Sequence, residues 1–172
     1  LKDVKGEVDI KNVCFHYDES KKLIEDFNLH VKPGMRVAIV GPTGCGKTTV
    51  INLLMRFYDV NSGSIKVDGT DIRDITRGSL RTNYGMVLQE TWLRSGSIRD
   101  NIAMGKPDAT DEEMYEALET AQAREFVDAK EGGLSYEIEQ GGRNLSGGQR
   151  QRAWIAMTLA QETEMILLDE PT

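Results

Sequence analysis

The sequence has 172 residues, of which 39% are hydrophobic, and this is enough for one domain with a substantial core. Its formal net charge of −7 argues against binding to nucleic acid or to anionic membrane surfaces, because both attract basic proteins. The two cysteines, Cys14 and Cys45, match neither a disulfide framework nor zinc-ligand spacing, which is typical of a reducing, cytosolic environment. No apolar run approaches the length of a membrane span.

The first third of the chain predicts antiparallel strands. The stretch GEVDIKNVCFHY alternates in part and would place Val13, Phe15 and Tyr17 on one face. FNLHVKPG predicts a second short strand that is closed by a Pro-Gly turn, as in an antiparallel pair. Residues 1–34 are therefore expected to form an antiparallel β arm.

A strand, a glycine-rich loop and a helix follow, which is the usual opening of an α/β unit. The apolar run over residues 35–40 predicts the strand. Val50, Ile51, Leu54 and Phe57 recur at helical spacing after the loop.

The loop itself, GPTGCGKT at residues 41–48, fits the phosphate-binding pattern G-x-x-x-x-G-K-[ST], which is called a P-loop. Gly44 and Gly46 would let the backbone approach a triphosphate, whose charge the loop amides and the helix N-terminus would stabilise. Lys47 would bridge the β- and γ-phosphates, and the Thr48 hydroxyl would bind Mg²⁺. The alternative, a glycine-rich turn with an exposed lysine, is disfavoured by the flanking strand and helix.

The middle of the chain changes from strand to helix. VNSGSIKVDGTDIRDI predicts a short strand between two turns, and YGMVLQE predicts a buried strand that ends at Gln89. From Thr91 to about Asn144 the pattern is helical, most clearly in DATDEEMYEALETAQAREFV. Thr110 or Asp111 would cap this helix, whose first turn is rich in acids that the helix dipole favours.

A second glycine-containing loop, LSGGQ at residues 145–149, opens the last predicted helix. Ser146 offers a hydroxyl and an N-cap, while Gly147 and Gly148 expose amides at the helix start, where phosphate can bind. By itself, however, this pattern favours an ordinary capped helix start.

The final stretch, MILLDEPT, predicts a buried strand that delivers two carboxylates. Asp169 follows four apolar residues, as expected for the Mg²⁺-side acid of a P-loop enzyme. Glu170 could turn toward the γ-phosphate and polarise an attacking water. A solvated acidic turn is the alternative.

In this order, the P-loop, the strand that ends in glutamine, LSGGQRQR and LLDEPT together resemble the nucleotide-binding domain of ABC (ATP-binding cassette) transporters, over essentially the whole chain. DIKNVCFHYDE, SGSIKVDGTDIRDI, LRSGSIRDNIAMG and EQGGRNLSGGQRQR are similar to the ATPase half of ABC exporters. The tail AWIAMTLAQETEMILLDEPT is similar instead to ATPases of iron–siderophore importers, so export and import both stay open.

The resemblance implies an α/β P-loop NTPase fold with a RecA-like parallel core. The core would comprise residues 35–90 and 150–172, with the antiparallel arm at 1–34 and a helical subdomain at 91–149 that ends in the signature motif. Because the family's D-loop and switch histidine follow LLDEPT, the chain is expected to be an ATPase domain that is incomplete at its C-terminus.

The resemblance also implies a function: binding of ATP and Mg²⁺, and hydrolysis that powers transport, most simply export. Expected partners are a transmembrane domain and a second nucleotide-binding domain in a head-to-tail dimer, but no nucleic acid, at the cytoplasmic face of the cell membrane. A nucleotide-binding fragment without turnover and a non-transport ABC ATPase are the alternatives.

Residue roles follow from the matched motifs. Glu170, Lys47 and Gln89 would be catalytic, and Thr48, Gln89 and Asp169 would contact the metal. Tyr17 would stack on adenine, although without the resemblance a core position is the better interpretation. The implied nucleotide-binding residues are Tyr17, Gly41, Thr43, Gly44, Cys45, Gly46, Lys47, Thr48, Thr49, Ser146, Gly147, Gly148 and Gln149.

Overall fold

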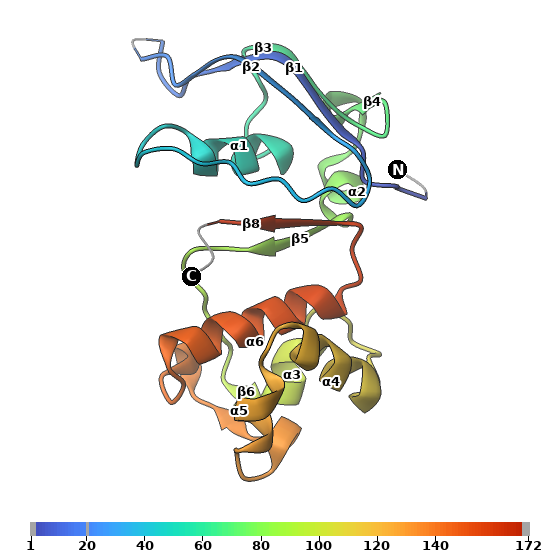
Figure 1. The fold of residues 1–172 in the computed structure, drawn as a ribbon, viewed down its shortest axis with the longest axis vertical. Coiled ribbons are helices and arrows are strands. Elements are labelled where there is room, and N and C mark those ends of the chain that lie inside the picture. The colour runs from blue at the N-terminus through green and yellow to red at the C-terminus, as the bar shows by residue number, and fades with distance from the viewer. Residues whose placement is uncertain (1–2, 20, 170–172) are drawn as a thin grey trace. The chain divides into compact units, whose positions relative to one another are not determined.

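The computed structural model describes residues 3–19 and 21–169. The chain divides into two compact units, Leu1–Tyr84 and Gly85–Thr172. Figure 1 shows the labelled helices and strands of both units.

The first unit is built on a four-stranded antiparallel sheet in the order β2-β1-β3-β4. Strand β1 (Val8–Phe15) lies between β2 (Ile24–Val31) and β3 (Ser62–Val67), and β4 (Thr70–Asp71) extends the β3 side. All three pairings are antiparallel, with Val8 opposite both Val31 and Val67. The predicted antiparallel pairing of the first two strands is thus confirmed.

Helix α1 (Lys47–Leu54) lies against one face of this sheet (Figure 1). Alternate strand residues face it because successive side chains of a strand point to opposite faces. Ile10, Ile65 and Val67 on the strands and Leu53 on the helix are each at most 2% exposed.

Arginine side chains hold the C-terminal end of α1. After β4 come a 3₁₀ turn, η1 (Ile72–Asp74), and the short helix α2 (Arg77–Arg81). Arg81 Nε donates a hydrogen bond to the Met55 carbonyl at 3.0 Å, and Arg77 Nε donates to the Arg56 carbonyl at 3.2 Å. These bonds pair carbonyls that a helix end leaves without intrahelical donors.

The strand predicted over residues 35–40 is absent from the structure, which has irregular backbone there. Met35, Val37, Ile39 and Val40 are 56%, 41%, 39% and 87% exposed. A strand requires a hydrogen-bonded neighbour, and β1, β2, β3 and β4, which form the sheet described for the first unit, do not pair with this segment. The apolar composition of residues 35–40 is typical of a strand, but composition does not indicate whether a neighbouring strand is available to pair with it.

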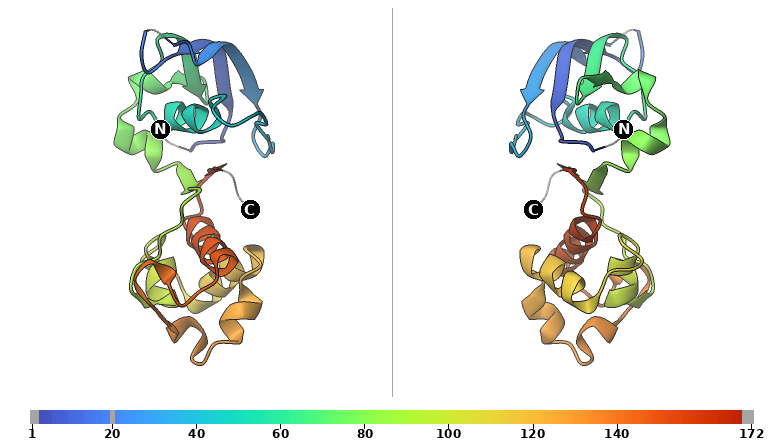
Figure 2. Two further views of the ribbon diagram at one scale, coloured as in Figure 1. Left: turned by 90° about the vertical axis from the view of Figure 1, so that its left-hand side faces the viewer. Right: turned by 90° about the vertical axis from the view of Figure 1, so that its right-hand side faces the viewer.

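The second unit is organised around α6 (Gly147–Ala160). On one side of α6 lies a pair of strands, β5 (Tyr84–Val87) and β8 (Met165–Leu168), which point the same way in Figure 1. On the other side, shorter helices pack along α6, as both views of Figure 2 show. These are α3 (Ile98–Ala103) and α4 (Asp111–Thr120), and α5 (Arg124–Asp128) packs against α4.

Helix α6 contacts β5 through one carbonyl group. Trp154 Nε1 donates to Met86 O at 3.0 Å, and Thr158 Oγ1 lies 3.4 Å from the same oxygen. At Gly85 a Cβ atom would lie 2.6 Å from Thr158 Cγ2, so the helix comes as close to this strand as glycine permits. The Val87 carbonyl, one residue on, accepts instead from Asp169 N of the β8 side at 2.9 Å.

The predicted helical stretch from Thr91 to Asn144 also contains β-structure. Besides α3, α4 and α5 it holds a small antiparallel pair, β6 (Gly96–Ser97) and β7 (Glu137–Ile138), and the 3₁₀ turns η2 (Gly133–Ser135) and η3 (Gln140–Gly142). The prediction of the helix over α4 is confirmed, and Thr110 rather than Asp111 is its N-cap.

Strand β8 is less buried than its apolar sequence predicts. Met165 is 8% exposed, but Ile166 and Leu168 are 42% and 46% exposed. β8 has one described neighbour in this unit, β5, so its apolar side chains are covered in part. Within the described ranges, no helix is both long and apolar enough to cross a membrane.

Candidate nucleotide-binding site

The glycine-rich loop turns directly into α1 through left-handed backbone. Gly44 and Gly46 have φ angles of 82° and 98°, a region that favours glycine. Gly46 is the N-cap of α1, and no side chain accepts a hydrogen bond from the first turn there. Successive amides in such a conformation form an anion-binding concavity at the positive end of the helix.

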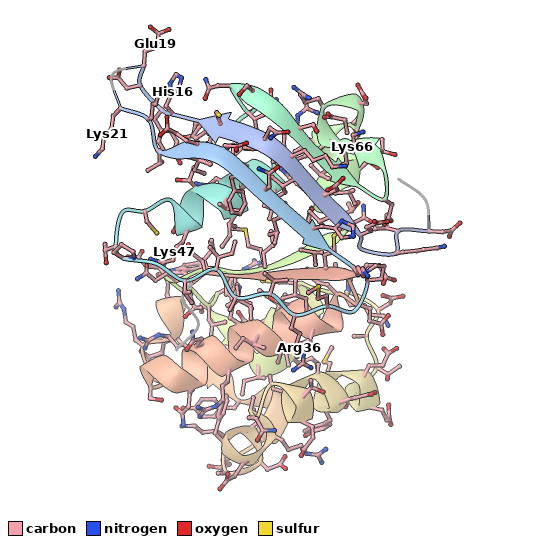
Figure 3. The ribbon with its side chains drawn as sticks, turned by 45° about the horizontal axis from the view of Figure 1, so that its top comes forward. His16, Glu19, Lys21, Arg36, Lys47 and Lys66 are labelled. Carbon is pink, nitrogen blue, oxygen red and sulfur yellow. The ribbon has the colours of Figure 1, made fainter. Side chains whose placement is uncertain are left out.

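Lys47 is folded over this loop. Its Nζ donates to the Gly41 carbonyl at 2.9 Å and to the Pro42 carbonyl at 3.2 Å, and Figure 3 places it at the start of α1. The ammonium group is thus held at the edge of the same loop whose amides would bind phosphate. Gly41 itself is constrained, because a Cβ there would lie 2.6 Å from Cys45 Sγ.

The residues between and after the glycines are placed for contact with a ligand or for support. Thr43 and Cys45 are exposed, as is Thr48 in the first turn of α1. Thr49 is 6% exposed, and its Oγ1 lies 3.3 Å from the hydroxyl oxygen of Tyr17. Thr49 therefore joins the P-loop helix to the residue that was expected to contact adenine.

Tyr17 lies two residues beyond the end of β1 and is 54% exposed. Its neighbours on the predicted strand face, Val13 and Phe15, are 1% and 4% exposed. The predicted shared face therefore applies to Val13 and Phe15, whereas Tyr17 projects from it. A residue that is 54% exposed does not belong to the core, so this alternative for Tyr17 is wrong.

In the second unit the LSGGQ loop at residues 145–149, the signature loop, forms a complete capping box. Ser146 is the N-cap of α6, its Oγ accepts from Gln149 N at 3.2 Å, and Gln149 Oε1 accepts from Ser146 N at 3.0 Å. Gly147 and Gly148 are exposed in the first turn. The predicted cap is confirmed, and Gln149 helps to build the helix start.

Gln89 and Asp169 follow the two paired strands of the second unit. Gln89 is exposed and lies two residues past β5, while Asp169 is 6% exposed and directly follows β8. Since both strands point the same way, the two residues lie beyond the same end of the pair (Figure 1). Glu170 lies outside the described residues.

The sequence motifs thus fall into two groups. The structure brings Tyr17, the P-loop and Thr49 together in the first unit, and the second unit holds Gln89, the signature loop and Asp169. Among residues 3–19 and 21–169, no cluster of three or more His, Cys, Asp or Glu side chains could hold a metal ion.

Sequence reasoning missed two sets of supporting residues. Tyr58 lies within 6 Å of both Phe15 and Tyr17, and Arg77 and Arg81 hold the far end of the P-loop helix. Tyr58 belongs to the stretch RFYDV directly after the helix, where two adjacent aromatic residues are visible in the sequence. The sequence does not indicate which other rings they contact.

A comparison with protein families matches residues 24–172 to the ABC transporter family. The chain therefore belongs to the ABC transporter family. It is 44% identical over all 172 residues to a fatty acid ABC transporter ATP-binding/permease protein of Mycobacterium bovis, covering 27% of that protein. It is 47% identical over 167 residues, 97% of the chain, to the β-(1→2)glucan export ATP-binding/permease protein NdvA of Bradyrhizobium diazoefficiens, covering 28% of that protein.

The fold of the chain is also similar to that of an ABC exporter. A bacterial Atm1-family ABC exporter with ATP bound superposes with a TM-score of 0.91 at 37% identity, over 100% of this chain and 31% of that one. The P-loop NTPase fold class is thus confirmed. The chain spans less than a third of the relatives it matches, and the alignments with the M. bovis protein and the Atm1-family exporter include the importer-like tail.

Proposed function

We propose that this chain binds MgATP and, as part of an ABC exporter, hydrolyses it to power transport. The observation that carries the proposal is the P-loop: two left-handed glycines, an α1 start without a side-chain cap, and Lys47 held at the edge of the loop. Backbone N–H donors and one cation therefore lie together at the start of α1. The first turn of this helix contains no carboxylate, which would repel a phosphate group.

Lys47 would exchange its two loop carbonyls for phosphate oxygens, and the loop amides would bind the β-phosphate. Thr48 and Asp169 would hold Mg²⁺, whose preference for hard oxygen ligands fits a hydroxyl and a carboxylate. When bound, this ion would neutralise charge on the transferring phosphoryl group.

Turnover would depend on the second unit. Gln89 would orient the attacking water or contact the metal, and Glu170 would polarise that water as it attacks the γ-phosphorus in line. Catalysis of this kind consists mainly of positioning and charge stabilisation.

Two partners are part of the proposal. A transmembrane domain would receive the conformational change, as the permease part in the names of the relatives suggests. A second copy of the domain would place its Ser146, Gly147 and Gly148 against the γ-phosphate in a head-to-tail dimer at the cytoplasmic face of the membrane. Exporter names among the relatives favour export.

The test is nucleotide affinity of a Lys47→Ala variant, measured by calorimetry with MgATP. Loss of a charge-assisted hydrogen bond should weaken binding by roughly ten- to a hundredfold. Lys66→Ala is the matched control, because Lys66 alternates with the buried Ile65 and Val67 and so lies on the face of β3 opposite α1. Equal affinity of the wild type and Lys47→Ala would contradict the proposal.

Phosphate release separates hydrolysis from simple binding. A chain that binds MgATP with the expected dependence on Lys47 but releases no phosphate, even within the full-length protein, would be a nucleotide-binding module.

A further inference from the structure

Three aromatic rings meet beside the P-loop helix in the first unit. The ring centroids of Phe15 and Tyr17 are 4.9 Å apart with an interplanar angle of 86°, and those of Tyr17 and Tyr58 are 5.0 Å apart at 85°. Phe15 and Tyr58 complete the triangle at 5.8 Å and 54°. The ring of Tyr17 is therefore nearly perpendicular to both of its neighbours, an arrangement that aromatic quadrupoles favour.

The hydroxyl of Tyr17 is fixed as well. It lies 3.3 Å from Oγ1 of Thr49, whose side chain is buried in the first turns of α1. Two ring contacts and one polar contact thus restrict the side chain of Tyr17, although 54% of this residue is exposed. An exposed tyrosine that nothing restrains would sample several rotamers.

Tyr58 is itself held in place by the chain that surrounds it. The adjacent Phe57 donates its N–H to Asn52 O at 2.9 Å, and its ring lies under the Arg81 guanidinium, 4.5 Å from the centroid. Arg56 Nη1 donates to the Ile72 and Ile75 carbonyls at 2.9 and 2.8 Å. The segment that carries Tyr58 is therefore anchored independently of Tyr17.

We propose that Tyr58 is a positioning residue for nucleotide-base recognition: together with Phe15 it holds the Tyr17 ring in one orientation, as a rigid platform on which a nucleobase stacks. The inference rests on the proposed function, because it deepens the binding of ATP at this loop. Tyr58 acts through Tyr17, and it is not required to touch the base.

Simple packing accounts for Phe15 but not for Tyr58. Phe15 is 4% exposed and belongs to the core, whereas Tyr58 is 46% exposed. Tyr58 leaves nearly half of its residue surface in water while its ring stands edge-to-face against that of Tyr17, so it contributes more to the orientation of Tyr17 than to the buried core.

The test compares two ligands that share phosphates and differ in the base. MgATP and magnesium tripolyphosphate are titrated by calorimetry into the 172-residue chain as wild type, Tyr58→Leu, Tyr58→Phe, Tyr17→Ala, and the double variant of Tyr17→Ala with Tyr58→Leu. Tyr17→Ala should weaken MgATP binding by about five- to a hundredfold, the range of base–aromatic stacking. Tyr58→Leu should weaken it by about two- to twelvefold, the range of an aromatic pair.

Three further results are expected. Tyr58→Phe, which keeps the ring, should bind MgATP as the wild type does. Tripolyphosphate affinity should be the same in all five proteins, because the P-loop donors are unchanged. Tyr58→Leu should have no additional effect on MgATP once Tyr17 is alanine.

Each other outcome overturns the inference in a recognisable way. Equal losses for both ligands in Tyr58→Leu would mean damage to α1, and a loss that persists in the Tyr17→Ala background would mean direct contact of Tyr58 with the base. Unchanged MgATP affinity in Tyr58→Leu would exclude any role. A wild type that binds tripolyphosphate as tightly as ATP would remove the platform but keep the P-loop, whereas a wild type that binds neither would overturn the proposed function as well.

Discussion

In the first unit, α1 begins at Gly46 without a side-chain cap, whereas in the second unit α6 begins at Ser146 with a complete capping box. Both starts come from glycine-containing loops, and the sequence marks both for phosphate. The difference shows that a helix start can serve either ligand binding or the stability of the helix itself. The start of α1 has no side-chain cap at the place where a ligand would bind, while the start of α6 is stabilised by its own cap and exposes Gly147 and Gly148.

Ligand affinity and turnover should therefore depend on different units. The variant with the largest expected effect is Glu170→Gln. The amide keeps the shape of the side chain and loses the base, so turnover in the full-length protein should fall by ~10²–10⁴-fold. MgATP affinity, which we assign to the first unit, should remain at the wild-type value. Phosphate release and calorimetry measure the two quantities, and wild-type turnover would remove Glu170 from the proposed mechanism.

A backbone substitution in the first unit tests whether the two units are independent in stability. Gly63 has φ 82°, and a Cβ there would collide with the Lys11 and Asn12 carbonyls of β1. Gly63→Ala should reduce the free energy of unfolding by about 2–4 kcal/mol through strain and overpacking. Gly69→Ala is the matched control, since Gly69 has φ 78° but no atom within 4 Å of the added Cβ.

The readout for Gly63→Ala can separate the units, because both tryptophans, Trp92 and Trp154, lie in the second one. The loss of nucleotide binding in a urea titration should shift to lower urea, because the P-loop belongs to the first unit. Unfolding followed by tryptophan fluorescence should shift less. Coincident shifts would mean that the chain unfolds as one cooperative body.

Removing the N-cap of α6 should destabilise the second unit and leave nucleotide binding by the first unit unchanged. Ser146→Ala loses the hydroxyl that accepts from Gln149 N, so the second unit should lose about 1 kcal/mol of stability. MgATP affinity of the single chain should not change. Ser95→Ala, an exposed serine of the same unit that is not an N-cap, is the control. A tenfold loss of affinity in Ser146→Ala would break the proposed division.

The smallest expected effect concerns the indole that anchors α6 to β5. Trp154→Phe keeps an aromatic side chain but replaces the indole by a smaller phenyl ring, and loss of the hydrogen bond from Nε1 to Met86 O should cost about 0.5–1.5 kcal/mol. Trp92→Phe, which removes a 54% exposed indole, should cost less. Urea unfolding followed by circular dichroism compares the two, and equal stability of both variants would argue that Thr158 alone suffices for this carbonyl.

Local features of the fold could be predicted from the sequence, whereas long-range pairing could not. The P-loop helix, the capped start of α6 and the antiparallel β1–β2 pair depend on nearby residues and were predicted correctly. The strand at residues 35–40 was predicted from composition, but a strand forms only where a neighbour pairs with it. The contacts of Tyr58 with Phe15 and Tyr17 join segments about 40 residues apart, and only the sheet and α1 determine that they meet.

The Met86 carbonyl has a consequence for solubility. Carbonyls of successive strand residues point to opposite sides, and because Val87 O faces β8, Met86 O faces the other edge of β5, which pairs with no described strand of the second unit. An open edge with the sequence YGMV, which contains no charge, would invite pairing with a strand of another molecule. Trp154 and Thr158 occupy this carbonyl from α6, so we expect the helix that carries the signature loop to hinder edge-to-edge aggregation as well.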